Sequence, residues 1–108
     1  MAKKAKSTVS RKSSKKPFVI VRAHTAGVHA GYYQSRKGDT IVLTDSIRLW
    51  RWVGASLSQV ATTGPATGDN KFGEVVPKTE IVSPQGFEVI HCTPVATRAI
   101  QAVPSWRV

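Results

Sequence analysis

The chain has 108 residues and a mass of 11.7 kDa, which is room for one domain. Hydrophobic residues make up 41% of it, which excludes disorder throughout, and 16 Lys and Arg against 6 Asp and Glu give a net charge of +10. The single cysteine excludes a disulfide scaffold and a cysteine-based zinc site, and no apolar run approaches the roughly 20 residues that span a bilayer. We therefore expect an intracellular protein without a membrane partner.

The positive charge is concentrated at the N-terminus. Residues 1–16 contain no acid and hold seven of the sixteen cations, Lys3, Lys4, Lys6, Arg11, Lys12, Lys15 and Lys16. This segment has almost no apolar side chains to offset the entropy of ordering, so we predict a disordered basic arm over residues 1–17. Residues 18–108 carry nine cations and six acids, a net charge of 9 − 6 = +3, and form the predicted single small β-rich domain.

Short runs rich in β-branched residues predict strands after the arm. Gly31 interrupts the second strand and indicates a bulge or a close approach of two backbones. A kink at Asp45-Ser46 divides the third strand from the fourth, and Pro77 separates the fifth from the sixth. The predicted strands span residues 18–24, 28–34, 40–43, 47–53, 74–76, 80–82 and 87–92.

Two segments carry the signals of short helices. Ser56 is a predicted N-cap for residues 56–62, and Thr93 followed by Pro94 predicts a helix that runs to about Val103. Composition predicts turns and loops at residues 35–39, 63–73 and 84–86. The predicted fold class is therefore mainly β (α+β): a small antiparallel sheet or partly open barrel with two short helices and a disordered basic N-terminal arm.

The predicted fourth strand carries a cluster of arginine and tryptophan. By alternation, Arg48, Trp50 and Trp52 project to one face, which Arg22 joins across the sheet, while Arg51 faces the other side at its rim. Guanidinium and aromatic planes both suit nucleotides, so these five residues form a candidate ligand face. The alternative, which the small size of the body favours, is that the tryptophans belong to the core.

No pattern of catalytic or metal-binding residues stands out. His24, His29 and His91 match no metal-ligand spacing, and His91 and Cys92 are predicted to point to opposite faces of a strand, which excludes a simple thiol–imidazole couple. The six carboxylates form no evident acid–base pair, and there is no glycine-rich phosphate loop. We expect a non-enzymatic protein without metal or cofactor, in which Cys92 is a small buried hydrophobe.

The run Arg-Leu-Trp-Arg-Trp-Val-Gly-Ala at residues 48–55 resembles a small uncharacterised domain common in tailed-phage genomes. The similarity extends over about residues 20–108, through Thr25–Gly31 and the closing Thr93-Pro94 helix. Such domains have no assigned activity. The resemblance therefore implies a phage origin, with a location in the host cytoplasm or the virion, and no mechanism.

These features together predict a phage-encoded binding protein whose arm engages nucleic acid or another polyanion within a larger assembly. One alternative is a virion structural or cementing protein whose arm clamps the acidic surface of a neighbouring subunit. A second alternative is a sponge for a nucleotide signal of host defence. In that alternative an oligomer would bind the nucleotide at a subunit interface through Arg22, Arg48, Trp50 and Arg51.

Overall fold

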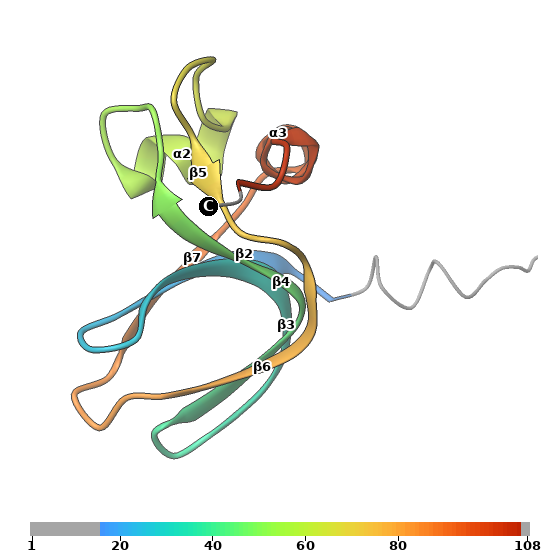
Figure 1. The fold of residues 1–108 in the computed structure, drawn as a ribbon. Helices are drawn as coiled ribbons and strands as arrows, with labels where there is room; N and C mark the ends of the chain where they lie inside the picture. The colour runs from blue at the N-terminus through green and yellow to red at the C-terminus, as the bar shows by residue number, and fades with distance from the viewer. Residues whose placement is uncertain (1–15, 107–108) are drawn as a thin grey trace, which may run out of the picture.

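A computed structural model describes residues 16–106, which form six strands and two helices (Figure 1). Six of the seven arm cations, all except Lys16, lie outside the described residues. The strands are β2 (Phe18–Ala23), β3 (Gly27–Lys37), β4 (Thr40–Arg51), β5 (Lys71–Phe72), β6 (Val76–Val82) and β7 (Phe87–His91). The helices are α2 (Leu57–Thr63) and α3 (Pro94–Ala102). The predicted mainly β body with two short helices is confirmed.

The six strands belong to one open antiparallel sheet. Its order is β5-β4-β3-β2-β7, and β6 pairs with the first half of β4 while β5 pairs with the end of β4. Figure 1 shows that the sheet curls, so that β3, β4 and β6 bend away beneath β2 while both helices lie above it. The sheet therefore has an inner face within the curl and an outer face under the helices.

Both faces of the sheet bury apolar side chains. In β2, Phe18 and Ile20 point to the helices while Val19 and Val21 point into the curl, as the alternation predicts. The helix-side cluster is Phe18, Ile20, Ala30, Ile47, Leu49, Leu57, Val60, Ala61, Phe72 and Ile100. The inner cluster is Val19, Val21, Ala23, Ile41, Leu43 and Ile81.

A bulge in the middle of β4 produces the bend of the sheet. Gly31 of β3 lies opposite two residues of β4, Asp45 and Ser46, and Asp45 has a φ of 47°. A Cβ atom at Gly31 would lie 2.8 Å from the Cβ of Ser46, so only glycine fits there without a shift. The predicted close approach at Gly31 and the predicted kink at Asp45-Ser46 are both confirmed, although β4 continues through the kink as one strand.

The bulge also changes which side chains of β4 face the helices. Leu43 belongs to the inner cluster and Ile47 to the helix-side cluster, although strict alternation would put both on one face. The extra residue shifts the alternation by one position. It thus lets a single strand contribute to both clusters.

Several predicted boundaries are wrong. Pro77 does not divide two strands but lies inside β6, because β6 is at the sheet edge and needs no amide donor on its free side. The predicted loop 63–73 contains β5, and Phe72 of β5 is buried in the helix-side cluster. The turn predicted at 35–39 is shorter, since β3 continues to Lys37 and only Gly38 and the next residue turn.

The helices begin where their capping residues predict. Ser56 Oγ accepts a hydrogen bond from the Gln59 amide at 3.2 Å, and Thr93 Oγ1 accepts one from the Ala96 amide at 3.0 Å. Thr93 Oγ1 also donates to the Thr62 carbonyl at 2.7 Å, which links the end of α2 to the start of α3. These contacts fix the helices side by side over the sheet.

Candidate functional site

Of the five residues of the predicted ligand face, the structure brings Arg48 and Trp50 together. The Arg48 guanidinium carbon lies 5.0 Å from the centroid of the Trp50 ring, and Arg48 Nη1 donates to the Ala26 carbonyl at 3.4 Å. Trp50 is 58% exposed, so the expectation that the tryptophans are core residues is wrong for this one. Trp50 is exposed because its neighbour Leu49 points to the face under the helices, so Trp50 points to the other side of the strand.

Arg48 and Trp50 form the wall of a pocket of about 260 Å³, here called the Arg48 pocket. The side chains of His29 and Ser46 are buried at 4% and 2% exposure beneath them. The full lining is His29, Ser46, Arg48, Trp50, Gly73, Glu74, Val76 and Thr79. The pocket therefore combines a cation, an exposed aromatic ring, one carboxylate and a polar floor.

The polar side chains of the floor form hydrogen bonds within the protein. His29 Nε2 lies 2.9 Å from the Ala26 carbonyl, which can only accept, so Nε2 carries the proton and donates. Burial lowers the pKa of His29 below its ordinary value, and the charge of Arg48 lowers that pKa further against the opposing effect of the Ala26 hydrogen bond. Ser46 Oγ is 2.6 Å from Thr79 Oγ1. Neither pair is an arrangement of nucleophile and base.

Arg22 does not join the Arg48 pocket. His29 pairs with both Val21 and Arg48 across neighbouring strands, which puts Arg48 on the inner side of the sheet, and Arg22 points to the opposite side. There Arg22 Nε forms a salt bridge of 3.1 Å with Glu88 of β7. The predicted shared face is wrong for Arg22. Strands β2 and β4 both pair with β3, and their register with β3 places Arg22 and Arg48 on opposite sides of the sheet.

Arg51 and Trp52 also separate from the pair. Arg51 Nε lies 3.6 Å from Asp69, which Lys71 also contacts at 3.0 Å, and the Lys71 hydrogen bond and charge hold the pKa of the Asp69 carboxyl below its ordinary value. Trp52 is partly buried against the helix-side cluster, where the core expectation is confirmed. Lys71 Nζ in turn lies 5.7 Å from the ring of Trp106.

A second basic surface lies where the arm meets the body, and only its first residue was predicted. Lys16 and Arg98 line a groove of about 430 Å³, here called the arm-root groove. Its lining contains no carboxylate and consists of Lys16, Pro17, Phe18, Tyr32, Cys92, Pro94, Thr97, Arg98 and Gln101. Gln101 Nε2 donates to the Tyr32 hydroxyl at 3.0 Å, which ties α3 to β3 across the groove.

Sequence reasoning missed Arg98 because the helix that contains it is predicted from its capping residues and its apolar side chains, and neither signal points to Arg98. Its neighbours Ala96 and Ile100 are buried, so Arg98 lies on the exposed side of α3. Cys92 is half-buried rather than fully buried, and it packs against the helix-side cluster. Burial raises the pKa of the Cys92 thiol to about 11, so it stays protonated at neutral pH.

One family profile, described as a domain of unknown function, DUF6948, matches residues 16–100. The chain belongs to the DUF6948 family. No curated protein and no solved structure matches it. The DUF6948 match includes every residue that lines the Arg48 pocket. It also includes every residue that lines the arm-root groove except Gln101. The family assignment confirms an uncharacterised domain and supplies no activity.

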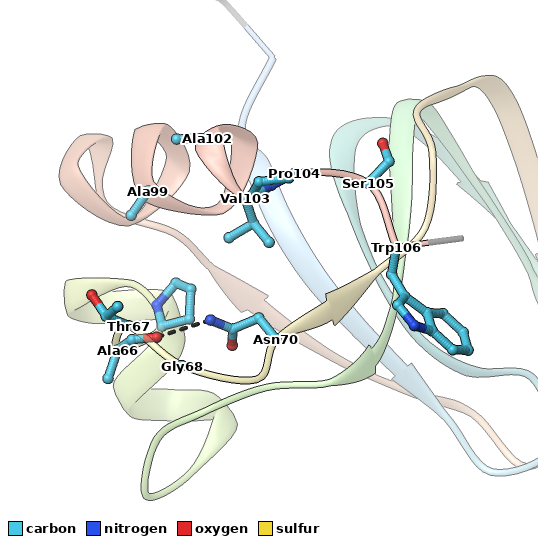
Figure 2. Close-up of a pocket in the computed structure, with 11 residues that line it drawn as sticks. Ala66, Thr67, Gly68, Asn70, Ala99, Ala102, Val103, Pro104, Ser105 and Trp106 are labelled. Atoms are coloured by element: carbon cyan, nitrogen blue, oxygen red, sulfur yellow. Dashed lines mark hydrogen bonds between the residues drawn. The ribbon is translucent and has the colours of Figure 1, made fainter. Parts of the chain in front are cut away.

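Another pocket of the DUF6948 domain, of about 510 Å³, opens between α3 and the loop after α2 (Figure 2). Its lining has no charged residue. The amide of Asn70 is used within the fold, because it donates to the Ala66 carbonyl at 2.9 Å and accepts from the Val53 amide at 2.8 Å. This pocket therefore offers no positive charge to an anion.

Residues 16–106 contain neither a cluster of metal ligands nor a helix that could cross a membrane. Within residues 16–106, no three His, Cys, Asp or Glu side chains gather where they would hold a metal ion. None of the helices in that range has the length and apolar content needed to cross a membrane.

Proposed function

We propose that this protein is a non-enzymatic binding protein that holds nucleic acid through its basic N-terminal segment and the arm-root groove. The proposal starts from the charge of the sequence, where residues 1–16 carry seven cations and no acid. Lysine and arginine neutralise phosphates and release counterions, which gives affinity without sequence preference. Blocks of like charge of this kind commonly serve as interaction segments.

The observation that carries the proposal is the composition of the arm-root groove. The cations of the segment would be followed on the body by Lys16 and then by Arg98, which is exposed on α3. No carboxylate lines the groove, so nothing there repels a phosphate. By contrast, Arg22, Arg51, Lys71 and Lys78 each form a salt bridge with a carboxylate. The groove therefore extends the basic surface of the segment onto the folded domain.

The test is binding of labelled DNA to the full chain over a series of salt concentrations. Eight phosphate contacts, from the seven cations of residues 1–16 and from Arg98, predict a slope of log K against log salt of about −7. Replacing Lys3, Lys4, Lys6, Arg11, Lys12 and Lys15 by Gln in the full chain should reduce that slope by about 5 units. The melting temperature should not change, because none of these residues belongs to the described fold.

Arg98→Gln tests the contribution of the body. It should lower the magnitude of the slope by about 1, since one phosphate contact is lost. Arg22→Gln is the matched control, because Arg22 is also an exposed arginine but is paired with Glu88 away from the groove. Absent binding, or binding that does not respond to salt, contradicts the proposal; equal effects of Arg98→Gln and Arg22→Gln contradict the role of the groove.

We further propose that the protein acts in a tailed phage, either free in the host cytoplasm or in the virion. The resemblance of residues 48–55 supports this setting. Mass spectrometry of purified particles separates the two locations. Many copies per particle favour a structural role beside DNA binding, and absence from particles favours the free protein.

A further inference from the structure

We infer that the Arg48 pocket is a second contact site and that it selects single-stranded nucleic acid, with a base stacked on Trp50 and a phosphate on Arg48. This inference rests on the proposed function and names the form of nucleic acid that is bound. Three observations carry it. They are the exposure of Trp50, the charge of Arg48 and the hydrogen-bonded side chains on the floor of the pocket.

Trp50 is exposed because it lies on the same side of β4 as Arg48, away from the helices. Leu49, between these two residues, belongs to the helix-side cluster and pairs with Phe72 of β5. The Trp50 ring is left 58% exposed. An exposed indole is a stacking platform, because every base has a π-face that can cover it.

Arg48 supplies the charge that a phosphate needs beside such a platform. Its guanidinium lies over the Trp50 ring, and among residues 16–106 no carboxylate is within salt-bridge distance of it. The contact with the Ala26 carbonyl uses one of five N–H donors. The remaining donors match a phosphate oxygen.

The floor of the pocket indicates stacking without reading of base edges. His29 donates to the Ala26 carbonyl, and the Ser46 and Thr79 hydroxyls bond one another, so each of these side chains has a partner within the protein. A hydroxyl can either donate or accept a hydrogen bond, so Ser46 and Thr79 do not select among bases. Recognition is therefore tolerant of sequence. It favours a single strand, because bases inside a duplex stack on each other and present no free face.

The experiment measures binding of the full chain to three ligands with similar numbers of phosphates: oligothymidylate, a duplex of half as many base pairs, and inorganic polyphosphate. Trp50→Leu should weaken oligothymidylate binding by about tenfold, the loss of one base–aromatic stack, and should abolish most of the quenching of tryptophan fluorescence. Polyphosphate binding should not change, because it offers no base. Trp50→Tyr should restore most of the affinity, and Arg48→Gln should weaken oligothymidylate binding severalfold.

Trp106→Leu is the matched control, because Trp106 is 38% exposed and also lies beside a cation, Lys71. It should leave oligothymidylate binding unchanged. If Trp50→Leu has no effect on oligothymidylate, or weakens all three ligands equally while the melting temperature holds, the inference is wrong and the proposed function stands. If the unaltered chain shows no salt-dependent binding to any of the three ligands, the proposed function itself is wrong.

Discussion

The two faces of the sheet are buried in different ways. The helix-side cluster is completed by α2, β5 and α3, whereas the inner cluster is enclosed by the curl of the sheet itself. Burial on the first face therefore depends on docking of the two helices onto the sheet. Burial on the second face depends on the bulge between β3 and β4. Within residues 16–106, one small sheet thus builds two clusters, and no second layer covers its inner side.

The two proposed contact sites follow the same division. The arm-root groove shares Phe18, Tyr32 and Cys92 with the helix-side cluster and its surroundings. The Arg48 pocket lies on the inner side of the sheet, next to the bulge at Ser46. The sites are therefore on opposite faces, and each depends on the packing of its own face. We therefore expect the two faces to behave as separate units.

Phe72→Ala should have the largest effect. Phe72 is 1% exposed in a two-residue strand and packs in the helix-side cluster, so the cavity should reduce the free energy of unfolding by about 3–5 kcal/mol. Urea denaturation measures it. A loss below about 1 kcal/mol would show that β5 contributes little to the face that α2 and α3 cover.

Gly31→Ala tests the inner face. The new Cβ would meet the Ser46 side chain and backbone, so we expect a loss of about 1–3 kcal/mol. Gly73→Ala is the control, because a Cβ there meets nothing closer than 3.7 Å. Similar stabilities of the two variants would contradict the account of the bulge.

Lowering the pH should destabilise the protein through His29. The pKa of His29 is lowered by burial, so the unfolded chain binds a proton more readily than the folded one. The stabilisation is complete above the ordinary pKa of about 6.5 and is lost as the pH falls below it. Denaturation at pH 7 and pH 5 should show this loss in the unaltered chain and in the exposed control His24→Gln, and less of it in His29→Gln.

The smallest expected effect is coupling between the two contact sites. Because they lie on opposite faces, Arg98→Gln and Trp50→Leu should weaken oligothymidylate binding additively, to within about 0.5 kcal/mol. Oligothymidylate binding by the double variant, compared with the sum of the two single effects, measures the coupling energy. A larger coupling energy would mean that one binding event spans both faces.

Local sequence determined the elements whose signals are complete within a few residues. The caps at Ser56 and Thr93 succeed because each hydroxyl bonds an amide three residues away. The alternation in β2 and the close approach at Gly31 succeed because side-chain periodicity and the missing Cβ are properties of the strand itself. The mainly β class follows from these elements.

Tertiary structure decided everything that depends on a remote partner. Phe72 becomes a strand residue only through pairing with Leu49, and Pro77 fits into β6 only because that strand lies at an edge. The five-residue ligand face reduces to Arg48 and Trp50 for the same reason. Strand register sends Arg22 to the opposite face. The extra residue in β4 at Trp50 makes Trp52 pack against the helix-side cluster, since a one-residue shift exchanges the two sides of a strand.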